Sequence, residues 1–228
     1  MVDIHTHLLF GVDDGPKTVE ESIEMIRDAK KIGFNEFYLT SHYNKGRFCN
    51  NNYDRNYEIL KARCEELGLE VKLHKGNEVY LDENIDTVLK EKKFNVMWEN
   101  VLLVEFSPLT SVPAGENLIK KVLAAGFNPI LAHVERYSNF RGSDLMRLKK
   151  LGVKLQVNIG GEKPKHIVRL QKERHIDFLG SDAHGVERRS YREIQKEDKG
   201  HEKKQPVNRV FNSFFRSIFA GAWIRSDS

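Results

Sequence analysis

Eight residues with metal-binding side chains follow short apolar segments of this sequence. They are His5, His7, His42, Glu78, Glu105, His133, Asp182 and His184. Imidazole and carboxylate groups without a thiolate suit hard or borderline ions, namely Mn, Fe, Zn or Mg. Burying so many ionisable groups without a cation is costly. The eight side chains are also more ligands than one ion can use. A centre of two or more ions generates hydroxide from water and holds the attacking and leaving oxygens during displacement at phosphorus. The pattern therefore predicts hydrolysis of a phosphate ester.

Several basic residues lie close in sequence to these candidate ligands. They are Lys45, Arg47, Arg136, Arg188 and Arg189. A guanidinium group binds two phosphate oxygens at once and stabilises the charge that develops in the transition state. We therefore expect some of these residues to bind the phosphoryl group of a substrate. A surface salt bridge is the alternative for each of them.

Short apolar strands alternate with amphipathic helices, and these elements must position the candidate ligands. The predicted strands cover 2–4, 37–40, 70–73, 101–104, 129–132, 153–157 and 176–179, and the predicted helices cover 18–33, 57–67, 84–91, 118–125, 145–151 and 166–172. Strict alternation predicts a parallel sheet with right-handed crossovers, and seven strand–helix units predict a closed or nearly closed barrel. In α/β barrels the active site lies at the carboxyl ends of the strands, where the eight candidate ligands fall.

The composition is that of an ordinary globular protein. The chain has 228 residues with 37 Lys and Arg against 33 Asp and Glu, which gives a formal charge of +4. This slight basicity argues against a nucleic-acid partner, because dedicated binders carry a dense basic patch. Two cysteines cannot build a disulfide framework, and the first residues lack the apolar core of a signal peptide. We therefore expect a cytoplasmic protein.

The C-terminal segment, 190–228, differs from the predicted barrel domain, 1–189. Residues 185–209 are rich in charges of both signs, which predicts a solvated linker or an exposed helix. Beyond them, apolar residues recur at helical spacing over 207–219, and we expect this amphipathic helix to dock on the barrel. A membrane-surface or partner helix is the alternative, so any membrane contact would be peripheral.

Seven short motifs resemble the polymerase and histidinol phosphatase (PHP) superfamily. They are Val-Asp-Ile-His-Thr-His (2–7), Val-Asp-Asp-Gly-Pro-Lys-Thr (12–18), Thr-Ser-His (40–42), Gly-Arg-Phe (46–48), Val-Glu-Phe-Ser (104–107), Ala-His-Val-Glu-Arg-Tyr (132–137) and Ser-Asp-Ala-His (181–184). The likeness runs from residue 1 to about residue 189. It is greatest to the bacterial protein-tyrosine phosphatases of capsule and exopolysaccharide loci, because the Asp-Asp-Gly and His-Val-Glu-Arg-Tyr motifs are specific to that branch.

The resemblance implies the PHP fold, a distorted TIM-like (β/α)7 barrel of the α/β class, with three metal ions and Mn²⁺ as the usual activator. The ligand sets that it implies are His5, His7, Glu78 and Asp182 for one ion, Glu78, Glu105 and His133 for a second, and Asp14, His42 and His184 for the third. It implies that Arg136 and Arg189 hold the phosphoryl group and that a metal-bound hydroxide attacks without a covalent phosphoenzyme. The implied substrate is the phosphotyrosine tail of a bacterial tyrosine kinase that regulates polysaccharide export.

Other activities remain open at this point. The metal ligands do not separate a tyrosine phosphatase from a histidinol-phosphate phosphatase or another PHP phosphoesterase, because surrounding loops choose the substrate. The segment between Asn158 and Asp182 is shorter than in family members, which predicts altered packing of the last two units. An inactive metal-binding regulator is therefore the non-enzyme alternative.

Cysteine-dependent phosphatase chemistry is a further alternative. Cys49 and Arg55 have the Cys-x5-Arg spacing of that class, but no glycine lies between them. That chemistry needs a low-pKa thiolate within a loop whose amides surround phosphate. We interpret the spacing as a coincidence.

Overall fold

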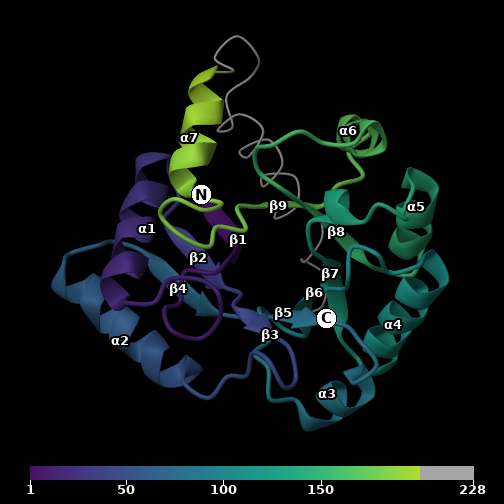
Figure 1. Cartoon of the computed structure of the whole chain (residues 1–228), viewed down its shortest axis with the longest axis horizontal. Coiled ribbons are helices and arrows are strands. Elements are labelled where there is room, and N and C mark those ends of the chain that lie inside the picture. Colours follow the sequence, from purple (N-terminus) through teal and green to yellow (C-terminus); the bar gives the residue numbers. More distant parts are fainter. Residues whose placement is uncertain (201–228) are drawn as a thin grey trace, which may run out of the picture.

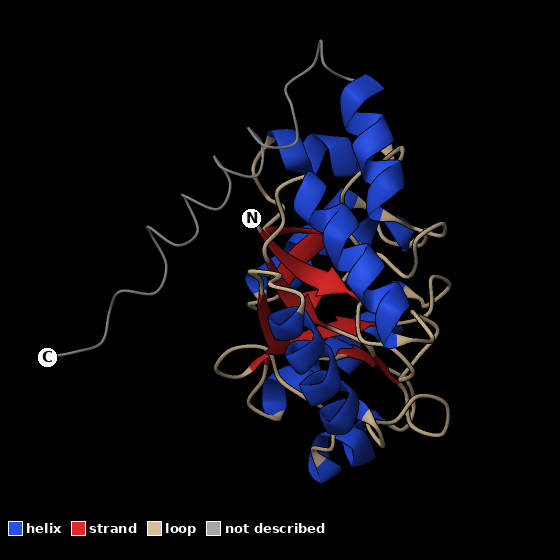
Figure 2. Cartoon of the chain, turned by 90° about the vertical axis from the view of Figure 1, so that its left-hand side faces the viewer, coloured by secondary structure: helices blue, strands red, loops and turns tan. Residues whose placement is uncertain are grey.

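The strands form a curved inner layer that the helices surround (Figure 1), and Figure 2 shows the helices covering its outside. The computed structural model describes residues 1–200. The strands are β1 (Val2–Thr6), β2 (Glu36–Leu39), β3 (His42–Tyr43), β4 (Lys72–Lys75), β5 (Glu78–Tyr80), β6 (Val101–Glu105), β7 (Asn128–Leu131), β8 (Lys154–Asn158) and β9 (Phe178–Gly180). The α-helices are α1 (Val19–Lys31), α2 (Tyr53–Glu66), α3 (Ile85–Glu91), α4 (Val112–Ala124), α5 (Gly142–Lys150), α6 (Lys165–Lys172) and α7 (Tyr191–Gly200). Within residues 1–200, no helix has the length and apolar character needed to cross a bilayer.

All the paired strands run parallel, as the alternation of strands and helices predicts. Three strands form one sheet in the order β1-β2-β4, and six form another in the order β3-β5-β6-β7-β8-β9. The predicted parallel α/β class is confirmed. The backbone hydrogen bonds nevertheless divide the curled layer into two sheets, so a single seven-stranded barrel stays a prediction.

Two breaks between strands lie directly before candidate ligands. β2 ends at Leu39 and β3 begins at His42, and β4 ends at Lys75 and β5 begins at Glu78. His42 pairs with Glu78 in the register of β3 and β5, and Glu78 pairs with Leu103 of β6. The breaks therefore place His42 and Glu78 side by side.

The first and last strands meet at a seam with few backbone bonds. Thr6 and Ala183 form an isolated parallel bridge. The His7 amide donates to the Ala183 carbonyl at 2.9 Å, and the Asp182 amide donates to the His5 carbonyl at 2.8 Å. The curled strand layer thus brings β1 into contact with the segment that follows β9.

The predicted elements agree well with the observed ones. Each of the seven predicted strands overlaps an observed strand, and each of the six predicted helices overlaps an observed helix. Helix α4 begins earlier than predicted, at Val112, because Ser111 is its N-cap and a proline occupies its first turn. Strands β3 and β5, of 2 and 3 residues, are absent from the prediction because they are too short to show an apolar pattern.

Apolar side chains on the two faces of the strands belong to different cores. Leu102 and Val104 of β6 pack in the core beneath α3 to α6. Leu103, between them, joins Ile4 and Ile130 in a smaller cluster. Because successive side chains in a strand point to opposite faces, this alternation buries one face against the helices and the other inside the curve.

Helix α7 begins the C-terminal segment and packs on α1. Tyr191 and Ile194 are buried in the core that α1 and α2 share. Arg192 donates from Nε to Asp28 Oδ2 of α1 at 2.5 Å and also contacts Glu24. The start of the charged segment, expected to be solvated, is therefore held on the domain. The helix predicted over 207–219 lies outside the described residues, and the domain boundary at 190 stays a prediction.

We expect Gly180→Ala to destabilise the protein. A Cβ atom on Gly180 would lie 2.6 Å from the His5 Cβ and 3.1 Å from the Gln156 Nε2, so the backbone of β9 would have to shift. Overpacking of this kind costs about 1–3 kcal/mol of unfolding free energy, which urea denaturation measures. Gly142→Ala is the control, because the nearest atom to its Cβ lies 3.8 Å away. An unchanged midpoint for Gly180→Ala would contradict the close approach of β9 to β1.

Candidate metal centre

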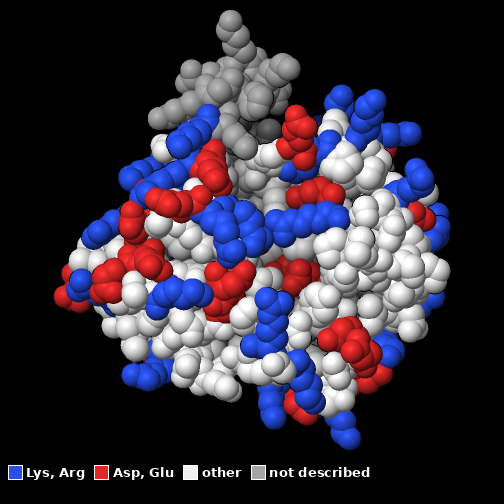
Figure 3. Space-filling model, in the orientation of Figure 1, with Lys and Arg blue, Asp and Glu red and all other residues white. Residues whose placement is uncertain are grey.

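The nine residues predicted as metal ligands lie together although they are far apart in the sequence. They are His5, His7, Asp14, His42, Glu78, Glu105, His133, Asp182 and His184. Six of them are buried, whereas Asp14, His42 and Glu105 are partly exposed. Figure 3 shows acidic side chains beside arginine and lysine side chains in the middle of one face. The cluster thus has a closed side and a side open to solvent.

The first group of possible ligands is fully buried and contains His5, His7, Glu78 and Asp182. The Nε2 atoms of His5 and His7 lie 3.4 Å apart. Glu78 Oε2 lies 3.3 and 3.4 Å from these two nitrogens, and Asp182 Oδ1 lies 3.4 and 3.5 Å from them. Donor atoms that lie about 2.0–2.2 Å from one ion are themselves roughly 3–3.5 Å apart. The spacing therefore fits a single cation.

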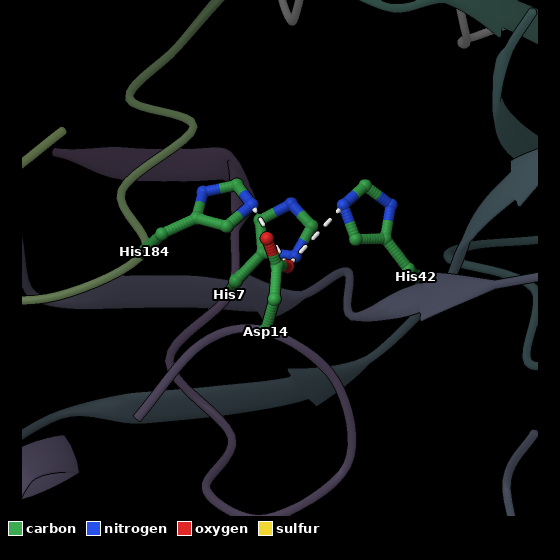
Figure 4. Close-up of side chains that lie close together, drawn as sticks. All are labelled: His7, Asp14, His42 and His184. Atoms are coloured by element: carbon green, nitrogen blue, oxygen red, sulfur yellow. Dashed lines mark ion pairs between the residues drawn. The ribbon is translucent and has the colours of Figure 1, made fainter. Parts of the chain in front are cut away.

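A second group surrounds the Asp14 carboxylate, as Figure 4 shows. Asp14 Oδ1 lies 3.4 Å from Nε2 of His184 and 3.5 Å from Nε2 of His42. The His7 ring stacks on the His184 ring with their centroids 3.7 Å apart. Because Asp14 and His42 are partly exposed, this group opens toward solvent.

Glu78 joins the first group to a third, which also contains His42 and Glu105. The His42 Nδ1 lies 3.1 Å from Glu78 Oε2 and 3.2 Å from Glu105 Oε1. The resemblance implies His133 beside these carboxylates, and the His133 Nε2 lies 2.9 Å from Glu78 Oε1 and 3.4 Å from Glu105 Oε2. Both oxygens of Glu78 thus face imidazoles, and this carboxylate belongs to both groups of possible ligands.

Three of the histidines are held by an oxygen behind the ring. The pairs are His5 Nδ1 with Gln156 Oε1 at 3.0 Å, His7 Nδ1 with Asp13 Oδ2 at 2.7 Å, and His184 Nδ1 with the Asp182 carbonyl at 2.8 Å. A ring that donates from Nδ1–H keeps the lone pair of Nε2 directed into the cluster. These partners therefore set both the tautomer and the direction of each ring.

Gln156 and Asp13 are functional residues that the sequence patterns alone do not predict. Gln156 Oε1 also accepts from the His133 amide at 2.7 Å, and Asp13 Oδ2 accepts from the His42 amide at 2.9 Å. A polar side chain in the middle of the apolar strand 153–157 was the available signal for Gln156. The first carboxylate of the Asp-Asp-Gly motif, which precedes the predicted ligand Asp14, was the signal for Asp13.

Several oxygens of the cluster lack a hydrogen-bond partner. Both oxygens of Glu78, Oδ1 of Asp182 and Oδ1 of Asp14 are buried without one. An unpaired buried carboxylate oxygen is costly, because it has lost its water without gaining a donor. Divalent cations would supply the missing partners, and a donor set of imidazoles and carboxylates fits them.

Without a cation, protonated imidazoles balance the buried carboxylates. Burial lowers the pKa of His42 and His133, but the negative carboxylates of Glu78 and Glu105, 2.9 to 3.4 Å from their ring nitrogens, outweigh it and raise the pKa to about 9 and about 10, respectively. Burial raises the pKa of Glu78, but the charge of His5 and the close approach of the His133 and His42 imidazoles hold that pKa well below its usual range. A metal must displace such protons, so its affinity for this site should increase with pH.

Three residues of the site adopt left-handed backbone conformations. They are His133 (φ 32°), Asp182 (φ 53°) and Arg189 (φ 46°). Residues other than glycine rarely adopt such conformations, which concentrate at functional sites because the surrounding structure must enforce them. The turns after β7 and β9 thus direct these side chains at the cost of local strain.

Both arginines predicted to bind phosphate contact the second oxygen of Asp182. Arg189 Nη1 lies 3.0 Å from Asp182 Oδ2, and Arg136 Nη2 contacts the same oxygen. Asn158 Nδ2 also donates to it at 3.0 Å. Because Oδ1 faces the imidazoles, a single carboxylate joins the histidine cluster to two guanidinium groups.

A cavity of about 410 Å³ begins at these guanidinium groups. Its walls include Arg136, Arg189, Glu193 and the loop that follows β8. It therefore adds a polar recess beside the cluster, large enough for part of a substrate.

The other basic residues singled out in the sequence make separate contacts. Arg188 donates to Asp14 Oδ2 at 3.0 Å. Lys45 pairs with Glu91 at 3.0 Å, and the Arg47 guanidinium lies 4.9 Å from the centre of the Phe48 ring. Of the five candidates, only Arg136 and Arg189 share the Asp182 carboxylate.

The two cysteines are not placed for thiolate chemistry. Cys49 is exposed in the loop before α2, and Arg55 is an exposed residue of that helix. Burial raises the pKa of the Cys64 thiol to about 11, which disfavours its thiolate.

Known proteins share both the sequence pattern and the fold. The tyrosine-protein phosphatase CpsB of Streptococcus agalactiae serotype III is 29% identical over 204 residues, which cover 82% of this chain and 84% of that protein. The tyrosine-protein phosphatase YwqE of Bacillus subtilis is 29% identical over 204 residues, which cover 84% of this chain and 80% of that protein.

Solved structures give the same picture. One from work on YwqE of Bacillus subtilis and CpsB of Streptococcus pneumoniae, described as metal-dependent tyrosine phosphatases, matches with a TM-score of 0.78 at 25% identity, covering 92% of this chain and 90% of that one. The phosphotriesterase homology protein of Escherichia coli matches with a TM-score of 0.53 at 12% identity over 81% of this chain and 82% of that one, which shows likeness of fold alone. Residues 1–215 match the family described as "Capsular polysaccharide synthesis, CpsB/CapC". The chain therefore belongs to the CpsB/CapC family.

Proposed function

We propose that this protein is a metal-dependent protein-tyrosine phosphatase. The Asp182 carboxylate carries the proposal: one oxygen faces the imidazoles of the first group, and the other contacts Arg136 and Arg189. A candidate metal site and two phosphate-binding groups therefore lie on either side of one buried side chain. Membership in the CpsB/CapC family and the tyrosine-protein phosphatase names of its relatives support this activity.

The nine clustered residues are the proposed metal ligands. Three groups of donor atoms support three ions. A donor set of nitrogen and oxygen without sulfur supports Mn²⁺, with Fe, Zn or Mg as the alternatives that metal analysis would distinguish.

The chain's own residues bind and orient the phosphoryl group. When bound, divalent ions would acidify a water molecule and neutralise charge on the phosphate. Arg136 and Arg189 have side chains 34% and 35% exposed, so they meet solvent where a substrate approaches. Each guanidinium binds phosphoryl oxygens and stabilises the charge that grows in the transition state. The buried Asp182 keeps both guanidinium groups beside the cluster.

The proposed substrate is a phosphotyrosine in the tail of a bacterial tyrosine kinase that controls capsule or exopolysaccharide synthesis in the cytoplasm. The family's place in capsular polysaccharide synthesis supports this choice. The cavity beside the arginines and the open side of the cluster suit an extended peptide more than a buried small molecule.

A distorted seven-unit barrel is the architecture that we infer for this site. In this reading β2 and β3 are two parts of one interrupted strand, and so are β4 and β5. The bridge between Thr6 and Ala183 supports closure of the ring.

The proposal predicts Mn²⁺-dependent hydrolysis of a phosphotyrosine peptide. Protein treated with a chelator should release no phosphate, and added Mn²⁺ should restore release, because the ions activate the water. Histidinol phosphate, assayed beside the peptide, should remain intact. Hydrolysis of histidinol phosphate alone would place the protein in the other branch of the superfamily. Metal binding without turnover of either compound would indicate a regulator.

Ligand variants test the same prediction at the level of residues. His5→Ala and Asp182→Asn should each lower kcat/KM by about a thousandfold or more, since the ions stabilise the transition state by several kcal/mol. His74→Ala is the control, because this partly exposed residue pairs with Glu36 outside the cluster. Full activity of His5→Ala would refute the assigned ligands.

The two arginines should contribute to turnover. Arg136→Ala and Arg189→Ala are each expected to lower kcat/KM by about a hundredfold, the usual loss when one group that stabilises transition-state charge is removed. Arg169→Ala is a matched control, because Arg169 on α6 has a side chain 78% exposed and pairs with Glu173 just after that helix. Steady-state kinetics on the phosphotyrosine peptide would measure both, and a normal rate for Arg136→Ala would remove this residue from the site.

Cys49→Ser should retain full phosphatase activity. The thiol is exposed in a loop and is not part of the ligand cluster. Alkylation of the wild-type protein with iodoacetamide should likewise label Cys49 without loss of turnover. An inactive Cys49→Ser protein with a normal metal content would revive the thiolate mechanism.

A further inference from the structure

The hydroxyl of Tyr191, the first residue of α7, lies at the seam between β1 and β9. Its oxygen is 2.7 Å from Asp3 Oδ2, 3.0 Å from Thr6 Oγ1 and 3.2 Å from Ser181 Oγ. The whole side chain is buried. One hydroxyl from a helix outside the strand layer therefore bonds to both sides of the seam.

These partners are the immediate neighbours of two proposed ligands. Thr6 directly follows His5 in β1, and Ser181 directly precedes Asp182 after β9. His5 Nε2 and Asp182 Oδ1 lie 3.4 Å apart in the first group. Their separation depends on how closely the two segments are held.

The Asp3 carboxylate joins the same two segments through the backbone. Its Oδ1 accepts from the His5 amide at 3.2 Å and from the Ser181 amide at 3.0 Å. Its Oδ2 accepts from the Tyr191 hydroxyl. A buried carboxylate must keep its hydrogen bonds, because each lost donor leaves a desolvated oxygen unpaired.

The ring and the hydroxyl of Tyr191 have separable roles. The ring packs near Phe34 and Phe37, with centroids 5.8 and 6.5 Å away. A phenylalanine would keep this apolar contact and lose only the hydrogen bonds. Two backbone hydrogen bonds also cross the seam, from the His7 amide to Ala183 and from the Asp182 amide to His5, and the side-chain bonds of Tyr191 add to them.

We infer that Tyr191 is a positioning residue of the metal centre, whose hydroxyl acts through Asp3, Thr6 and Ser181 to fix the distance between His5 and Asp182. The inference rests on the proposed function only in that these two residues bind a metal. Helix α7 is then part of the site although it contributes no ligand. Partners outside the ligand shell typically change metal affinity by about 10–100-fold when they are removed.

Tyr191→Phe in the full chain tests this role by metal binding rather than by turnover. The dissociation constant for Mn²⁺, measured by competition with a fluorescent chelator, should increase about tenfold. The visible absorption spectrum of the Co²⁺-loaded protein should also change, because it reports the arrangement of the ligands.

Tyr57→Phe is the matched control. Tyr57 on α2 donates to the Leu73 carbonyl at 2.8 Å, away from the seam. It should lose the stability of one hydrogen bond, while its dissociation constant for Mn²⁺ stays within about twofold of wild type. The comparison separates a general loss of stability from a displaced ligand.

The outcomes distinguish this inference from the proposed function. Wild-type affinity and an unchanged Co²⁺ spectrum in Tyr191→Phe would overturn the positioning role, even if the variant unfolds more easily. A wild-type protein that binds no Mn²⁺ would instead overturn the proposed metal centre. Asp3→Asn adds a second test: its loss of affinity combined with that of Tyr191→Phe should be smaller than the product of the two single losses, because the two side chains share one hydrogen bond. Multiplicative losses would contradict the route through Asp3.

Discussion

The burial of two carboxylates, Glu78 and Asp182, is the constraint that the rest of the structure meets. Their side chains are 0% and 1% exposed, and a charge removed from water is stable only when it is paired. Imidazoles surround Glu78, and imidazoles together with guanidinium groups surround Asp182. Since these partners come from separate strands, the strand layer has to curl until the strand ends converge.

Bringing the strand ends together would not by itself make a site, because each histidine ring must also direct its Nε2 atom into the cluster. Gln156 and Asp13 hold the rings of His5 and His7 from behind, and each also accepts a hydrogen bond from the backbone amide of another candidate ligand. The left-handed residues after β7 and β9 complete the arrangement by turning the chain inward. The site is therefore rigid on its buried side, and its partly exposed residues, Asp14, His42 and Glu105, lie on the side that faces solvent.

The sequence predicts that the candidate ligands lie together, but it does not predict the side chains that orient them. A parallel sheet places all its carboxyl ends at one edge, so metal-binding residues after apolar strands predict a shared site without any structure. Strands β3 and β5 cannot be predicted in this way, because two or three residues are too few to show an apolar pattern. The bond between His5 and Gln156 joins positions 151 residues apart, and that of Asp3 with Tyr191 joins positions 188 apart. Local patterns do not reveal such pairings, so the charged segment 185–209, which predicts a solvated linker or an exposed helix, contains a buried tyrosine at the start of α7.

The seam between β1 and the segment after β9 also sets the order in which parts of the fold can form during synthesis of the chain. Strand β1 pairs with β2 on one side, but its other partners are 181–191, which leave the ribosome much later than β1. At about 5–20 residues per second, the interval between Asp3 and Tyr191 is on the order of 10–40 s. During that time β1 keeps an unpaired edge, which is the kind of surface that associates with other chains. The proposed ligands His5 and Asp182 are consequently brought together only after residue 182 has been made, and until then the open edge of β1 can associate with other chains.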